Sequence, residues 1–180
     1  MDNKKLALFL GMMCGDGCLT TRTKKQGYKS YSVEFYNTDI SLVKLFDNLF
    51  YELFNTKGNF HPFNREGKKT IYEFRKYSLE LFEKVSSFGF PKGVKRDKLR
   101  IPHVINDFSP SEKLEFFRGF LITDGCIRSN GTIIFHSGSK NFLEEFCELT
   151  NNLFGVNKKV KEYVQKEKYL SYQYLLSRLK

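Results

Sequence analysis

The chain contains two copies of one short pattern, and this repeat limits the possible folds more than any other feature. The copies are residues 9–19 (FLGMMCGDGCL) and residues 117–127 (FRGFLITDGCI). They share a phenylalanine, a glycine and the run Asp-Gly-Cys in gapless register, 108 residues apart. A chain of 180 residues that repeats itself in this way is expected to fold as two similar halves.

The segments after the two copies also resemble each other. Two hairpins are predicted over residues 19–38 and 127–137, and each is followed by an amphipathic helix with a polar cap, at Thr38-Asp39 or at Ser137/Ser139. Basic, aromatic strand pairs are predicted over residues 58–76 and 156–176. A further helix, Ser78–Phe88, is expected in the first half alone.

These elements predict an α+β fold of two pseudo-symmetric αββαββ(α) repeats. Residues 1–90 form the first repeat, and residues 91–109 form a basic linker that contains proline and little regular structure. Residues 110–180 form the second repeat, which lacks a final helix.

Each pattern is predicted to be an apolar helix that ends in an aspartate, Asp16 or Asp124, between small residues. Gly11 and Gly119 would let the two helices approach closely, so that both carboxylates emerge at one end. Paired carboxylates repel each other and the negative ends of the helix dipoles, which raises the pKa of one of them. A divalent cation would relieve this repulsion, and the function this indicates is metal-assisted phosphodiester hydrolysis.

Composition narrows the function further. The formal net charge is +10 and aromatic residues make up 16%, which excludes a disordered basic tail. No apolar stretch approaches the roughly 20 residues that cross a membrane. Residues 1–90 carry +4 and residues 91–180 carry +6, so one nucleic acid could lie across both halves. The four cysteines lack zinc spacing and are expected to be free thiols in a reducing intracellular compartment, and no targeting signal is seen.

The two patterns resemble the LAGLIDADG motif of homing endonucleases, with residues 9–17 and 117–125 as diverged copies. Two copies in one chain resemble the monomeric, pseudo-symmetric class. The resemblance implies that the motif helices pack between the halves and that each half lays a curved four-stranded antiparallel sheet into the DNA major groove. It also implies site-specific hydrolysis of both strands of a long duplex site, with 3′ overhangs, by an enzyme encoded within an intron or intein.

The resemblance also implies a metal site. Asp16 and Asp124 would bind divalent metal at the scissile phosphates, helped by the backbone carbonyls of Gly15 and Thr123. Mg²⁺ is the expected ion, and Mn²⁺ or Ca²⁺ could substitute for binding.

Three other residues are catalytic candidates beside the two aspartates. Asn37 and Ser137 end equivalent predicted strands. Lys98 lies ahead of the second motif and resembles a basic residue of some relatives, where an ammonium would stabilise developing negative charge.

Strand alternation selects the side chains that would face DNA. Arginine reads guanine bidentately, asparagine or glutamine reads adenine, and lysine supplies attraction independent of sequence. The DNA-binding candidates of the first repeat are Thr20, Arg22, Lys24, Ser32, Glu34, Tyr36, Arg65, Lys68, Lys69, Glu73 and Arg75. Those of the second repeat are Arg128, Asn130, Thr132, His136, Lys158, Lys159, Lys161 and Gln173.

Other functions remain open at this point. An RNA maturase that binds its host intron, or a DNA-binding relative without catalysis, would use the same basic sheets. In either protein the motif helices would only pack the two halves together. Retention of both aspartates argues against these two functions, because helix packing alone does not require an acid in both places. A protein–protein adaptor is the least favoured alternative.

Overall fold

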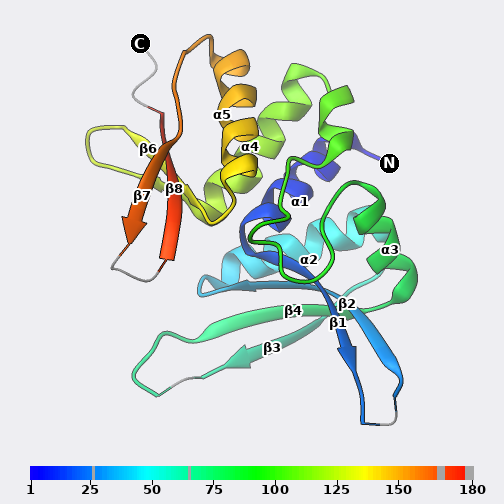
Figure 1. The fold of residues 1–180 in the computed structure, drawn as a ribbon. Coiled ribbons are helices and arrows are strands. Elements are labelled where there is room, and N and C mark those ends of the chain that lie inside the picture. Colours follow the sequence, from blue (N-terminus) through cyan, green and yellow to red (C-terminus); the bar gives the residue numbers. More distant parts are fainter. Residues whose placement is uncertain (26, 65, 166–168, 177–180) are drawn as a thin grey trace.

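The two predicted repeats form two half-domains that meet at a pair of crossed helices, α1 and α4 (Figure 1). The computed structural model describes residues 1–25, 27–64, 66–165 and 169–176. The first half-domain contains α1 (Asn3–Asp16), β1 (Gly17–Thr23), β2 (Lys29–Asn37), α2 (Ile40–Phe54), β3 (Asn59–Phe63), β4 (Ile71–Tyr77) and α3 (Leu79–Ser87). The second contains α4 (Pro110–Asp124), β5 (Gly125–Ile127), β6 (Ile133–Ser137), α5 (Lys140–Phe154), β7 (Lys161–Gln165) and β8 (Tyr169–Leu176).

Each half-domain has one four-stranded antiparallel sheet, as predicted. The strand orders are β1-β2-β4-β3 and β5-β6-β8-β7, so the two sheets have the same topology. The register is also shared, because Gly17 pairs with Phe35 and Gly125 pairs with Phe135. The sheets can therefore be compared position by position. The linker holds one short 3₁₀ helix, η1 (His103–Asp107), where little regular structure was expected.

Local sequence signals set the helix ends. Asp39 and Ser139 cap α2 and α5 through their side chains, as predicted, and Ser78 caps α3. The helix α2 ends at Phe54 and its C-cap is Asn55. Asn55 adopts the left-handed conformation there (φ 51°), which asparagine tolerates better than most residues.

The crossing of α1 and α4 depends on two glycines. A Cβ atom added to Gly11 would lie 2.9 Å from the backbone nitrogen of Phe120 and 3.0 Å from the Cα of Gly119. A Cβ added to Gly119 would lie 2.9 Å from the backbone nitrogen of Met12. The backbones therefore touch with no side chain between them, which confirms the close approach predicted from the small residues.

Aromatic side chains fill the space between each sheet and its helices. Phe35 of β2 stacks on Phe46 of α2 with ring centroids 4.4 Å apart, and Phe135 of β6 stacks on Phe120 of α4 at 5.5 Å. Each sheet thus covers the core with one face and presents its other face outward. Among the described residues, no helix is long and apolar enough to span a membrane.

Candidate active site

The two motif aspartates are the last residues of the crossed helices. Gly15 lies against Thr123, since a Cβ added to Gly15 would come within 2.6 Å of the Thr123 Cβ. The next residues along each chain segment, Asp16 and Asp124, therefore leave the helix pair at the same end. Both helices run directly into the first strand of their sheet, so each aspartate stands immediately before a sheet.

The environment raises the pKa of both carboxyl groups. Burial raises the pKa of Asp16, against a hydrogen bond from Asn37 and the charge of Lys95, which lower it. Asp124 keeps solvent access, but crowding by surrounding protein atoms and then the charge of Asp16 raise its pKa to about 6. The mutual repulsion expected from the sequence is present. This pair is a place where a cation would be stabilised.

Asn37 at the end of β2 holds the first aspartate. Its side-chain amide donates to Asp16 Oδ2 at 2.6 Å, and its own carbonyl oxygen accepts from the backbone N–H of Asp39 at 2.7 Å. The equivalent Ser137 at the end of β6 is oriented differently. Its hydroxyl accepts from the backbone N–H of Ser139 at 3.1 Å. The two sides of the site are therefore unequal.

The lysine that lies beside the aspartates is Lys95, whereas the catalytic candidate Lys98 is exposed on the linker. The Lys95 ammonium donates to the carbonyls of Met13 at 3.2 Å and Cys14 at 2.9 Å, and also to that of Gly15. It therefore compensates the negative end of α1 as well as the two carboxylates. Burial lowers its pKa, while the charges of nearby acidic groups, Asp124 and Asp16 among them, raise it.

The turn of the linker explains which lysine reaches the site. The backbone N–H groups of Lys98 and Leu99 both donate to the carbonyl of Lys95, which makes one helix-like turn. Leu99 is buried, and residues four apart share a side of such a turn, so Lys95 points inward with it. Lys98 is exposed. The apolar Leu99 four residues after Lys95 is the sequence signal that could have identified it.

Residues 111–180 match the family model of the LAGLIDADG-like domain. Over its length the chain is similar to the homing endonuclease I-DmoI in complex with DNA and Ca, with 21% identity, a TM-score of 0.71, and coverage of 97% of this chain and 83% of that one. The chain has the two-repeat LAGLIDADG fold. It is also similar to the homing endonuclease I-WcaI bound to its DNA recognition sequence, with 14% identity, a TM-score of 0.63, and coverage of 97% and 76%.

Curated relatives are much longer than this chain. An A-type ATP synthase subunit of Pyrococcus abyssi (strain GE5 / Orsay) is 29% identical over 128 residues, which are 71% of this chain and 11% of that protein. The chain spans about a tenth of the length of the curated relatives it matches. The aligned segment is therefore a small part of each of those proteins.

The helices α1 and α4 end where the two sheets begin, and most of the predicted DNA-facing residues lie on the outward faces of these sheets. In the first half, Thr20, Arg22, Tyr36 and Arg75 alternate with core residues, and Lys24, Lys68 and Lys69 are exposed near the strand turns. Arg65 lies outside the described residues. The site roles of all these residues stay predictions.

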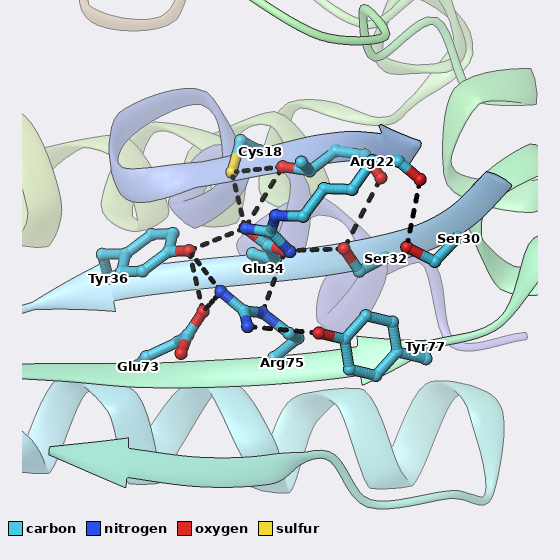
Figure 2. Close-up of polar contacts among 10 residues, drawn as sticks. Cys18, Arg22, Ser30, Ser32, Glu34, Tyr36, Glu73, Arg75 and Tyr77 are labelled. Atoms are coloured by element: carbon cyan, nitrogen blue, oxygen red, sulfur yellow. Dashed lines mark hydrogen bonds and ion pairs between the residues drawn. The ribbon is translucent and has the colours of Figure 1, made fainter. Parts of the chain in front are cut away.

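Three of the predicted DNA contacts are buried instead. Ser32, Glu34 and Glu73 lie on the outward face but are 1%, 1% and 0% exposed. Neighbouring polar side chains cover them, as Figure 2 shows. Alternation predicted the correct face, but it does not reveal that the two carboxylates on this face will pair with arginines of β1 and β4.

The second sheet has a different set of outward residues. His136, Gln173 and Lys161 share its outer face, because they pair across strands and Gln173 Nε2 lies 3.3 Å from His136 Nε2. Arg128, Asn130 and Thr132 lie in or beside the β5–β6 turn.

Lys158 and Lys159 precede β7 and lie beside α5, and their role as DNA contacts stays a prediction. They line a hollow with Cys147 and Asn151 of α5. The amide of Asn151 donates to the carbonyl of Lys158 at 2.9 Å, and its oxygen accepts from the Lys158 N–H at 3.0 Å. These contacts hold the segment before β7 against the helix.

Proposed function

We propose that this protein is a site-specific DNA endonuclease that hydrolyses both strands of a duplex and leaves 3′ overhangs. The observation that carries the proposal is the pair of aspartates at one end of the crossed LAGLIDADG helices, immediately before the two sheets. Several solved structures of similar fold are described as homing endonucleases, and complexes with DNA are among them. One chain supplies both halves, so a monomer is the acting species.

A divalent metal suits the residues of this site. Asp16 and Asp124 offer hard oxygen ligands whose mutual repulsion a cation would relieve. Within the described ranges, no group of three or more His, Cys, Asp or Glu side chains could hold a metal. Two carboxylates suit an ion such as Mg²⁺, which keeps waters and binds phosphate oxygens. Similar structures were solved with Ca, Mn and Mg.

When bound, the metal would polarise the phosphate and lower the pKa of a coordinated water. The chain's own residues prepare that site. Asn37 fixes the orientation of one carboxylate by its hydrogen bond to Asp16 Oδ2. Lys95 places a positive charge beside the pair, where it would stabilise negative charge that develops on the phosphate. The outward faces of the sheets would hold the duplex on either side.

Cleavage of a selected duplex by the wild type and by Asp16→Asn and Asp124→Asn tests the proposal. The target is first obtained by selecting cleaved sequences from a randomised duplex library in Mg²⁺. We expect each substitution to abolish double-strand cleavage while binding in Ca²⁺ persists. Full double-strand cleavage by both variants would refute the metal assignment.

If the wild type binds duplex DNA but cleaves none, the protein is a DNA-binding protein and not a nuclease. The similar structures described as complexes with nucleic acid contain DNA, which favours a DNA partner over RNA.

A further inference from the structure

The outward face of the first sheet holds a polar network centred on the carboxylate of Glu34, drawn in Figure 2. Arg22 of β1 pairs with it end-on, through one terminal nitrogen to Oε1 at 2.5 Å and the other to Oε2 at 3.1 Å. From β2, Ser32 donates to Oε1 at 2.6 Å, and the Tyr36 hydroxyl lies 2.7 Å from Oε2. Donors from β1 and from β2 itself therefore occupy this carboxylate.

Arg75 of β4 closes the network from the other side. Its Nε lies 3.0 Å from Glu34 Oε1, although the N–H does not point at that oxygen. Its terminal nitrogens reach the hydroxyls of Tyr77 at 3.2 Å and Tyr36 at 3.1 Å, and one also forms an ion pair with Glu73. The side chain of Arg75 is 18% exposed, so its position is fixed from several directions.

Of the two arginines in the network, Arg22 is the more accessible. Its side chain is 40% exposed, whereas that of its partner Glu34 is 1% exposed. A guanidinium has five N–H donors in a planar fork, and the pairing with Glu34 engages one on each terminal nitrogen. The ion pair fixes the orientation of the guanidinium and leaves its remaining N–H donors available to a ligand. Guanine presents two acceptors in the major groove that match two such donors.

The charges show why this arginine suits base reading better than phosphate binding. Two arginines and two glutamates make the network formally neutral, so Arg22 adds little net attraction for a polyanion. Phosphate contacts depend on uncompensated charge and release counterions, whereas base contacts depend on geometry. The buried carboxylate supplies that geometry.

The second sheet lacks this arrangement at the equivalent positions. Glu34 pairs across strands with Arg75, but its counterpart Ile134 pairs with Leu175. Asn130, which lies 108 residues after Arg22, instead accepts from the backbone N–H of Thr132 at 3.0 Å. Among the described residues, the polar network therefore belongs to one half of the protein.

We propose that Arg22 is a specificity-determining residue that reads a guanine in the half-site under the first sheet, and that Glu34 is its positioning residue. This inference rests on the proposed DNA-binding function. Since the second sheet carries an apolar pair at the matched position, the two half-sites of the target differ in base requirement, and the guanine is required on one side only.

Selection from a randomised duplex library in Ca²⁺, with sequencing of the bound fraction, tests this assignment. We expect the wild type to enrich a guanine at one position of one half-site. Arg22→Lys keeps the charge but loses the planar fork, and Glu34→Gln keeps the shape but loses the ion pair. Each should lower the preference for that guanine by about tenfold and leave the other enriched positions unchanged.

Arg128→Ala in the second half is the matched control. Its side chain is exposed, and the ion pairs found within the described residues do not include it. This variant should weaken binding to all sequences and retain the guanine. Thermal unfolding verifies that each variant is folded. If Glu34→Gln does not fold, the result for Arg22→Lys decides the test.

The outcomes separate the inference from the function it rests on. A guanine preference that survives in Arg22→Lys would overturn the inference and leave DNA binding intact. A wild type that enriches no sequence would overturn both.

Discussion

Lys95 is the residue whose role the structure changes most. Its ammonium binds three carbonyls at the end of α1, beside both aspartates. We expect Lys95→Met to slow single-turnover cleavage of the selected duplex by about a hundredfold, because preorganised positive charge at the reacting phosphate is lost. Binding in Ca²⁺ should persist.

Lys98→Met is the matched control, since it removes the same charge from the same linker at an exposed position. Its cleavage rate should stay within about twofold of the wild type. Equal reductions of the cleavage rate in Lys95→Met and Lys98→Met would show that the linker acts only through its overall charge.

Glu34 also gives a prediction for stability against pH. Burial opposes its ionisation, but hydrogen bonds from Ser32, Tyr36 and Arg22, with the charge of Arg75, lower its pKa overall. A lowered pKa in the folded state means that the ionised group stabilises the fold above the unfolded pKa, and that this contribution is lost as pH falls. Glu34→Gln should therefore destabilise the protein by about 1–3 kcal/mol at pH 7.

Urea unfolding at several pH values measures that difference. The gap between Glu34→Gln and wild type should narrow once pH falls below 4.5, the ordinary pKa of a glutamate carboxyl. A gap that stays constant down to about pH 3 would mean that Glu34 contributes through packing rather than through its charge.

At the scale of elements, the crossing of α1 and α4 is the contact most sensitive to added volume. Gly11→Ala would force a methyl group toward the backbone of Phe116 and Phe120, neither of which can move away as a side chain could. We expect a loss of about 3 kcal/mol in the free energy of unfolding. Ile122→Ala on the exposed side of α4 should cost about 0.5 kcal/mol or less, and similar losses in both variants would contradict this account.

The elements themselves could be predicted from the sequence, because each depends on local signals. The caps at Asp39 and Ser139, the alternation around Val33 and Phe35, and the glycine match at Gly11 and Gly119 all led to the observed structure. These signals lie within a few residues of the element they specify.

The positions that pattern did not reveal depend on partners distant in the chain. Lys95 enters the site because Leu99 is anchored in the core, and Lys158 lies beside α5 because Asn151 of that helix binds its backbone. Glu34 pairs with arginines from two other strands. Pattern alone assigns a face to such residues, but it does not reveal which neighbours will cover them.

At the scale of the whole molecule, the net charge of +10 predicts binding that weakens steeply with salt. Lys68 and Lys69 are exposed at the β3–β4 turn, where phosphate contacts are expected. Replacing both by alanine should reduce the slope of log Kd against log salt by about 1.8, with the selected sequence unchanged. The slope is measured by titrating the selected duplex in Ca²⁺ at several salt concentrations.

The pair Lys158→Ala and Lys159→Ala provides the comparison for this measurement. It removes the same two charges from the segment beside α5. The slope should change little in this variant. A slope that falls equally in both double variants would indicate attraction by total charge rather than by contacts at one face.

The backbone contact at Gly11 and Gly119 has a consequence for redesign. Residues on the outward faces of the sheets can be exchanged without touching the helix crossing, as Glu34 and its counterpart Ile134 already illustrate. The separation of the two aspartates depends on this crossing and on the contact of Gly15 with Thr123, and neither contact lies on the outward face of a sheet. Under the proposed function, variants selected for new target sequences would inherit the same stagger between their two cuts.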